Sequence, residues 1–236
     1  MSTRERSRRV EGIILRHQRW GEADRVLTIF TLELGKIRAI AKGARKTQSR
    51  KAGHLEPFMQ TALLLAQGRD WWIVTQADTV EAFLPLREDL QKTGYAAYIV
   101  ELSDKFTYED GPNPSLYRLI IETMWHLAAD QPVFIVIHFY EIRLLDILGF
   151  RPQLFQCVIC EEEIQANDQY FSALHGGVVC PNCAHKSEDS RRISMDALKY
   201  LRHFQRSTYQ QALAANPDES TAIEVEGIMQ WYLTFL

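Results

Sequence analysis

Long apolar runs are missing from this sequence of 236 residues. A membrane-spanning helix needs roughly 18 consecutive apolar residues, and the longest approach to that length, residues 133–150, is broken by one histidine and three charged residues. Near the N-terminus, the apolar stretch 12–15 is far shorter than the core of a signal peptide. We therefore expect a soluble, cytoplasmic protein that is not exported.

The short motifs of nucleotide-binding and hydrolytic enzymes are also missing. The sequence contains neither Gly-x-x-x-x-Gly-Lys-Ser/Thr, which cradles phosphates, nor the Gly-x-Gly-x-x-Gly of dinucleotide-binding folds. It has no Gly-x-Ser-x-Gly and no His-Glu-x-x-His, and the acidic run Glu161–Glu163 is more typical of a solvated turn than of a two-metal site. We expect a protein that is not an enzyme; a nucleic-acid-modifying enzyme with a structural metal is the alternative.

Positive charge is concentrated at the start of the chain. Residues 1–51 hold 14 Lys/Arg against 5 Asp/Glu, whereas the remainder holds 13 against 25, so the net charge of −3 conceals two segments of opposite sign. A solvated surface normally intersperses both signs. The basic segment therefore indicates an anion-binding surface, with nucleic acid as the leading ligand. The alternative is a basic surface that the acidic remainder neutralises, as in a scaffold protein.

Up to about residue 80, short apolar and β-branched runs alternate with polar turns, which predicts strands. The predicted strands cover residues 10–17, 25–31, 36–41, 59–67 and 71–80. Five short strands favour a small closed barrel. Residues 43–53, rich in Lys, Arg, Ser and Gln, are predicted to form a mobile loop between the third and fourth strands.

From about Leu86 the apolar spacing becomes helical. Asn113–Pro114 predicts the start of one helix, and another begins near Pro132 and stops before Gly149, although its β-branched start also permits a strand. Two more helices are predicted to begin at Ser194 and at Asn216–Pro217. The predicted division is 1–82 for the barrel, 83–150 for a helical domain, 151–188 for a cysteine-bearing element, and 189–236 for C-terminal helices packing on the helical domain.

All four cysteines occur in two Cys-x-x-Cys pairs, Cys157 with Cys160 and Cys180 with Cys183, separated by nineteen residues. Each pair can hold one edge of a tetrahedral ion, and the intervening segment can form a hairpin that brings the pairs together. Two disulfides are the alternative, but they conflict with the lack of an export signal. A closed shell of four thiolates predicts one structural Zn²⁺, with His175 and His185 outside the ligand set.

The third predicted strand has a basic face. Alternation places Lys36, Arg38 and Lys42 on one side, and Arg45 continues this charge into the following loop. No acidic residue occurs from Lys36 to Ala52. These four cations are the predicted DNA contacts, and their spacing indicates phosphate binding that is independent of base sequence.

Tryptophans offer a second way to hold nucleic acid, by stacking on unpaired bases. Adjacent strand residues face opposite ways, so at least one of Trp71 and Trp72 should pack inward, and core packing is the favoured interpretation for both. Trp20, beside Arg19, could contact a base or a partner.

Several motifs, in this order, resemble the RecO family of bacterial recombination mediators. They are Glu11–Leu15, Gly21–Arg25, Leu34–Lys36, Ala41–Arg45 and Leu148–Pro152, followed by the two cysteine pairs. The resemblance covers nearly the whole chain. It implies an α+β multidomain fold: an N-terminal OB-fold β-barrel, and a central and C-terminal α-helical domain with an inserted zinc-binding element that carries four cysteines.

The resemblance also implies a function in recombinational DNA repair. Members of the RecO family bind single- and double-stranded DNA, anneal complementary single strands and, working with RecR, help load recombinase onto DNA covered by single-strand-binding protein. For this chain it implies zinc ligands at Cys157, Cys160, Cys180 and Cys183, DNA contacts at Lys36, Arg38, Lys42 and Arg45, and a location at the bacterial nucleoid. The C-terminal tail of single-strand-binding protein is expected to bind the helical region 86–149, near Arg118 and Arg143.

Overall fold

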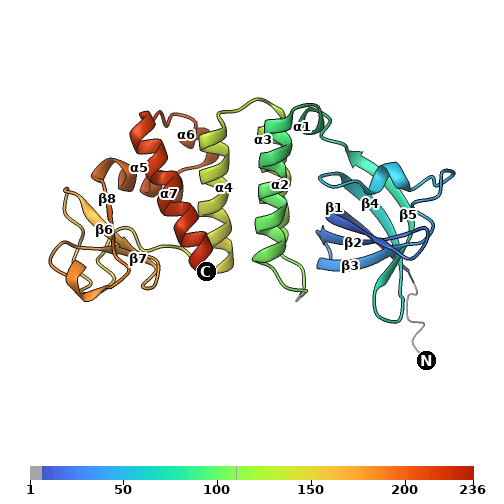
Figure 1. Cartoon of the computed structure of the whole chain (residues 1–236), viewed down its shortest axis with the longest axis horizontal. Coiled ribbons are helices and arrows are strands. Elements are labelled where there is room, and N and C mark those ends of the chain that lie inside the picture. Colours follow the sequence, from blue (N-terminus) through green and yellow to red (C-terminus); the bar gives the residue numbers. More distant parts are fainter. Residues whose placement is uncertain (1–6, 110) are drawn as a thin grey trace. The chain divides into compact units, whose positions relative to one another are not determined.

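The computed structural model describes residues 7–109 and 111–236 and forms two compact units, Met1–Asp130 and Gln131–Leu236 (Figure 1). The first unit contains a barrel and helices α1 to α3, and the second contains helices α4 to α7 and the cysteine-bearing element. The segment predicted as one helical domain, 83–150, is thus shared between the units. Residues 1–6 of the basic start lie outside the described residues.

Five strands form the barrel, as the sequence predicts. They are β1 (Ser7–Trp20), β2 (Asp24–Thr31), β3 (Gly35–Ala41), β4 (Gln60–Ala66) and β5 (Trp72–Glu81). The sheet closes in the order β1-β2-β3-β5-β4, with β3 and β5 parallel and the other neighbours antiparallel. This is the five-stranded barrel arrangement of an OB-fold.

Alternation along β3 builds one side of the barrel core. Ile37, Ala39 and Ala41 are buried, whereas Arg38 is exposed, because successive side chains of a strand point to opposite faces. Gly35, which opens the strand, has a φ of 69°, and a Cβ there would lie 1.8 Å from the Gly111 carbonyl oxygen. Only glycine fits this turn without strain.

Three helices complete the first unit. They are α1 (Pro85–Glu88), α2 (Leu90–Lys105) and α3 (Pro114–Ala128). The Asp89 side chain accepts hydrogen bonds from two amides at the start of α2, and Asn113 caps α3 by accepting from the Leu116 amide, as predicted. Helix α2 packs on α3 and contacts β1, so the helices and the barrel form one unit.

The second unit contains α4 (Val133–Leu148), α5 (Met195–Arg206), α6 (Tyr209–Ala212) and α7 (Glu219–Phe235). Residues 133–137 are helical rather than a strand, and α4 ends at Gly149 with a φ of 83°. Ser194 caps α5 as predicted, but α7 is capped by Asp218, which accepts from the Thr221 amide, rather than by Asn216. Helices α5 and α7 pack on α4.

The hairpin predicted between the two cysteine pairs is present, and a third strand, just after the predicted boundary at residue 188, extends it into a small sheet that the sequence did not predict in full. Its strands, in the order β7-β6-β8, are β6 (Gln169–Ser172), β7 (Gly177–Val179) and β8 (Arg191–Ile193). Short 3-10 turns occupy Ala52–Leu55 and Ala184–Lys186. In the part of the chain that the structure describes, no helix combines the length and apolar character needed to cross a bilayer.

Candidate metal centre and nucleic-acid interface

The two cysteine pairs meet in the folded chain. The sulfur atoms of Cys157, Cys160, Cys180 and Cys183 all lie within 4.8 Å of one another, and none forms a disulfide. The Cys160 and Cys180 Sγ atoms are 3.8 Å apart. A tetrahedral ion with metal–sulfur bonds of about 2.3 Å separates its ligands by about 3.8 Å, so this arrangement fits one metal ion.

Tight backbone turns aim these sulfurs inward. The Glu161 amide donates to the Cys157 carbonyl at 2.8 Å, and the Cys183 amide donates to the Cys180 carbonyl at 2.9 Å. Glu161 has a φ of 64°, a conformation that favours glycine. The Cys180 amide donates to Cys157 Sγ at 3.3 Å, a contact that stabilises a thiolate.

The thiols of the cluster differ in their affinity for protons. Burial raises the pKa of the Cys157 thiol, but amide donors from Cys180, Cys160 and Ile159 outweigh burial and lower this pKa to about 6. Burial and the neighbouring thiols of Cys180 and Cys160 raise the pKa of Cys183 to about 12. Four adjacent thiolates repel one another, and a cation at their centre would remove this repulsion.

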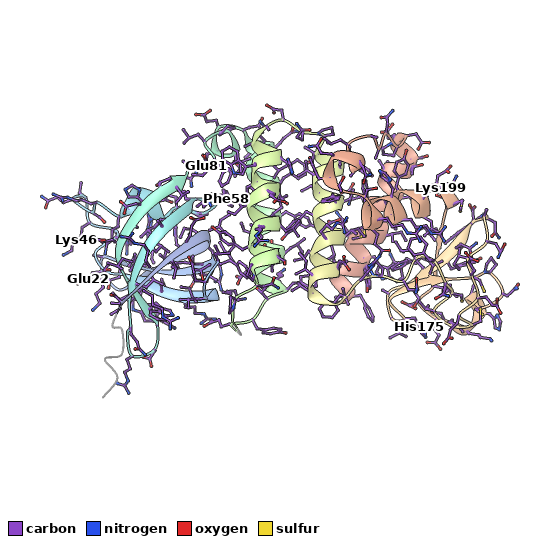
Figure 2. All side chains as sticks on the ribbon, turned by 180° about the vertical axis from the view of Figure 1, so that it is seen from behind. Glu22, Lys46, Phe58, Glu81, His175 and Lys199 are labelled. Carbon is purple, nitrogen blue, oxygen red and sulfur yellow. The ribbon has the colours of Figure 1, made fainter. Side chains whose placement is uncertain are left out.

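The two nearby histidines lie outside the cluster, as predicted. His175, labelled in Figure 2, is hydrogen-bonded through Nδ1 to Ser172 Oγ at 3.0 Å, and Ser187 Oγ lies 3.3 Å from the same nitrogen. His185 is exposed on a 3-10 turn. Among the described residues, the four cysteines form the one group of His, Cys, Asp and Glu with metal-binding spacing.

The predicted DNA contacts differ in how free their charges are. Lys36 is only 12% exposed in its side chain, and its Nζ donates to the Asp104 carbonyl oxygen at 2.6 Å and contacts Asp104 Oδ1 at 3.1 Å. The Arg38 side chain is 50% exposed and pairs with Glu109 at 3.1 Å. Lys42 and Arg45 are exposed.

The turn between β1 and β2 and the loop after β3 are joined. The Gly43 amide donates to Asp24 Oδ1 at 2.8 Å, and the Arg45 amide donates to the Ala23 carbonyl at 2.8 Å. Turn hydrogen bonds thus organise the start of the segment predicted as a mobile loop. Figure 2 shows Lys46 of this loop and Glu22 of the β1–β2 turn projecting outward from the barrel.

A groove of about 520 Å³ runs between β3 and the loop that joins β4 to β5. Arg38, Arg69 and Trp71 are among its lining residues, together with the acidic side chains of Asp70 and Glu109. Trp71 packs edge-to-face on Trp20, with ring centroids 5.2 Å apart. Trp71 and Trp72 both line the groove, and Trp72 also packs against the barrel core, as predicted.

Comparison with known proteins places these features in one family. The family model described as "Recombination protein O N terminal" matches residues 5–83, and that described as "Recombination protein O C terminal" matches residues 87–235. This chain belongs to the RecO family. Family membership makes it a DNA repair protein, with an OB-fold barrel and a four-cysteine cluster that can hold a metal ion.

Three RecO relatives illustrate how far the similarity extends. The DNA repair protein RecO of Roseiflexus sp. (strain RS-1) is 38% identical over 230 residues, covering 98% of this chain and 81% of that protein. The protein of the same name from Bifidobacterium adolescentis is 42% identical, covering 80% and 77%. That from Desulforamulus reducens is 31% identical, covering 96% and 88%.

Sequence reasoning on this RecO-family chain missed the acidic partners of the barrel. Asp104, at the end of α2, accepts hydrogen bonds from Arg16 at 2.7 Å and from Lys36. Burial acts to raise the pKa of its carboxyl group, but the two cations together outweigh burial and lower this pKa. Glu109 follows in the next loop. Asp104 lies 68 positions after Lys36, and no local pattern connects such distant residues.

Proposed function

We propose that this RecO-family protein is a non-enzymatic recombination mediator that binds single- and double-stranded DNA through its barrel and anneals complementary single strands. The observation that carries this proposal is the row of exposed cations Arg38, Lys42 and Arg45 along β3 and the joined loop. Cations at this spacing bind phosphates without reading bases.

Annealing needs no covalent step in this mechanism. Bound cations neutralise phosphates and release counterions, so repulsion between two strands falls and base pairing can proceed. The exposed pair between Arg38 and Glu109 is weak in water, because pairs of this kind contribute about 0 to 1 kcal/mol. Arg38 can therefore exchange the carboxylate for a phosphate. Lys36 must leave Asp104 before it can do so, and we expect its contribution to be smaller.

The cysteine cluster is proposed to hold Zn²⁺ as a structural ion. Zn²⁺ prefers tetrahedral thiolate sites, and four protein ligands leave no open position for water or substrate. The residues that would hold it are Cys157, Cys160, Cys180 and Cys183. The ion would fix the fold of the element and supply no chemistry to DNA.

Partner proteins are proposed from the family resemblance. We expect the chain to work with RecR and to help load recombinase onto DNA covered by single-strand-binding protein, at the nucleoid in the bacterial cytoplasm. For the acidic tail of single-strand-binding protein, Arg118 is the freer of the two predicted cations because it is exposed. Arg143 donates to the Ser207 carbonyl and lies over the Phe139 ring.

The test of the barrel site uses two variants that should change the DNA affinity in opposite directions. Replacing Arg38 and Lys42 by glutamate should lower the affinity for unrelated DNA sequences similarly and impair annealing. If about four to six phosphates are neutralised, the wild-type slope of log affinity against log salt is roughly −3 to −4, and it should flatten in this variant. Glu109→Gln, which frees Arg38, should raise the affinity a few-fold.

The matched control is Lys105→Glu, which reverses an exposed cation paired with Glu101 on α2. It should leave DNA binding nearly unchanged. A folded double variant with wild-type affinity and salt slope would assign DNA binding to another surface. Annealing should proceed without nucleotide or added metal. Covalent turnover of DNA would instead favour the alternative of a nucleic-acid-modifying enzyme.

A further inference from the structure

Two arginines of α5 share one aromatic ring next to the cysteine cluster. The guanidinium carbons of Arg202 and Arg206 lie 5.0 Å and 3.6 Å from the centre of the Phe155 ring. Arg202 Nε also donates to the Leu154 carbonyl at 2.7 Å. Phe155 is fixed by its backbone, which accepts from the Ile164 amide at 3.0 Å. The two cations are therefore held in place before any ligand binds.

This arrangement places two guanidinium groups side by side without a carboxylate from the described part of the chain in direct contact with either. Like charges one helical turn apart repel, and neither arginine forms an ion pair among the described residues. Burial and the charge of Arg206 lower the pKa of Arg202, while the charge of Glu163 acts in the opposite direction. Stacking on the ring offsets the repulsion, and an anion at this point would remove it.

We propose that Arg202 and Arg206 form a second DNA site, in which their guanidinium groups bind backbone phosphates of a second strand. Guanidinium is planar and binds phosphate through two parallel hydrogen bonds. Arg206 is exposed, so its outer edge is open to such a ligand. An acidic peptide tail would also need an apolar surface beside the cations, but here the guanidinium groups already cover the ring of Phe155.

This second site is separate from the barrel interface, and only its role in annealing rests on the proposed function. Annealing requires two strands to be held close together, and the barrel belongs to one compact unit while this arginine pair belongs to the other. With one phosphate site in each unit, a single chain can bind two strands at the same time.

The experiment measures binding of a second strand by the full-length, metal-loaded protein. The protein is first saturated with one labelled oligo(dT), and a second oligo(dT) carrying an acceptor dye is then titrated while energy transfer is recorded. Because two dT strands cannot pair, the signal reports simultaneous binding alone. Arg206→Glu should weaken second-strand binding about five-fold, and loss of one phosphate contact should flatten its salt slope by about 0.7.

Lys199→Glu is the matched control. Lys199 lies on the same helix, is labelled in Figure 2, and is paired with Asp196 at 2.8 Å. It should leave second-strand binding unchanged. Should Arg206→Glu fail to fold, Arg206→Gln removes the charge from an exposed helical position with little change in size, and the same direction of effect is expected.

Two results would overturn the proposal. One is wild-type second-strand affinity and salt slope in the folded Arg206 variant. The other is unchanged DNA binding together with reduced binding of an acidic apolar peptide, which would assign the arginines to a protein partner. Loss of first-strand binding in the Arg38 and Lys42 variant tests the barrel site separately, so the two proposals can fail independently.

Discussion

The barrel and the cysteine-bearing element are stabilised in different ways. In the barrel, alternating side chains of five strands fill a common core that includes Ile14, Leu27, Leu63 and Leu65. The cysteine-bearing element has strands of only three or four residues and brings four sulfurs together. Apolar burial can stabilise the barrel without a ligand, whereas we propose that the element needs a cation held by its four cysteines.

Removing the metal should have the largest effect, and this effect should be confined to the cysteine-bearing element. Cys183→Ser deletes one ligand, and structural Zn²⁺ sites contribute roughly 10 to 16 kcal/mol in small peptides, so we expect the element to unfold locally. Elemental analysis should find one zinc per wild-type chain and much less in the variant. Limited proteolysis should then cut within 151–193 and spare the barrel. Full wild-type protease resistance after complete chelation would contradict a structural role for the metal.

Gly35→Ala should break the barrel by a purely steric route. The substitution forces a side chain onto a backbone with a φ of 69° and toward the Gly111 oxygen, which should cost roughly 2 to 4 kcal/mol of unfolding free energy. Urea denaturation followed by circular dichroism measures this loss. Gly94→Ala is the control. Gly94 is exposed within α2, and nothing lies within 4 Å of the position that an added Cβ would occupy. The free energy of unfolding of this variant should rise by about 1 kcal/mol.

Trp20→Ala tests whether the barrel also binds unpaired bases. Trp20 is 50% exposed and contacts Trp71 at the groove. Stacking contributes about 1 to 3 kcal/mol per base, so affinity for single-stranded DNA should fall by that amount. Affinity for an abasic strand of equal length should not change. Trp125→Ala is the control, because Trp125 is 49% exposed and packs edge-to-face on Phe83. Equal losses on both strands would exclude stacking.

The smallest expected effect is a pH dependence at Asp104. Its folded-state pKa lies below the ordinary value of 3.8, so the stability from its pairing with Lys36 and Arg16 is present above pH 3.8 and is lost as pH falls through the folded pKa. Asp104→Asn should therefore cost about 1 kcal/mol or less at pH 7 and nothing at the acidic end. Urea titrations from pH 7 downward measure the difference. A deficit that persists at low pH would point to packing instead.

The features that sequence predicted well are those encoded locally. Apolar alternation indicated all five barrel strands, and capping residues placed the starts of α3 and α5. Cysteine spacing predicted which sulfurs meet. The start of α7 was predicted two residues early, because Asn216 and Asp218 are both good caps and local preference cannot rank them. Strands β6 to β8 are too short to produce a periodic pattern.

The five barrel strands, the longer helices and the identity of the four sulfurs could be predicted from the sequence, since each has a signal in residues close together along the chain, whereas the short helix α6 was not predicted. Folding alone brings Asp104 to Lys36, Trp71 to Trp20, and two arginines to the Phe155 ring. These contacts join residues about 50 or more positions apart. Chain topology brings such residues together, and a local sequence pattern does not predict which distant residues will meet.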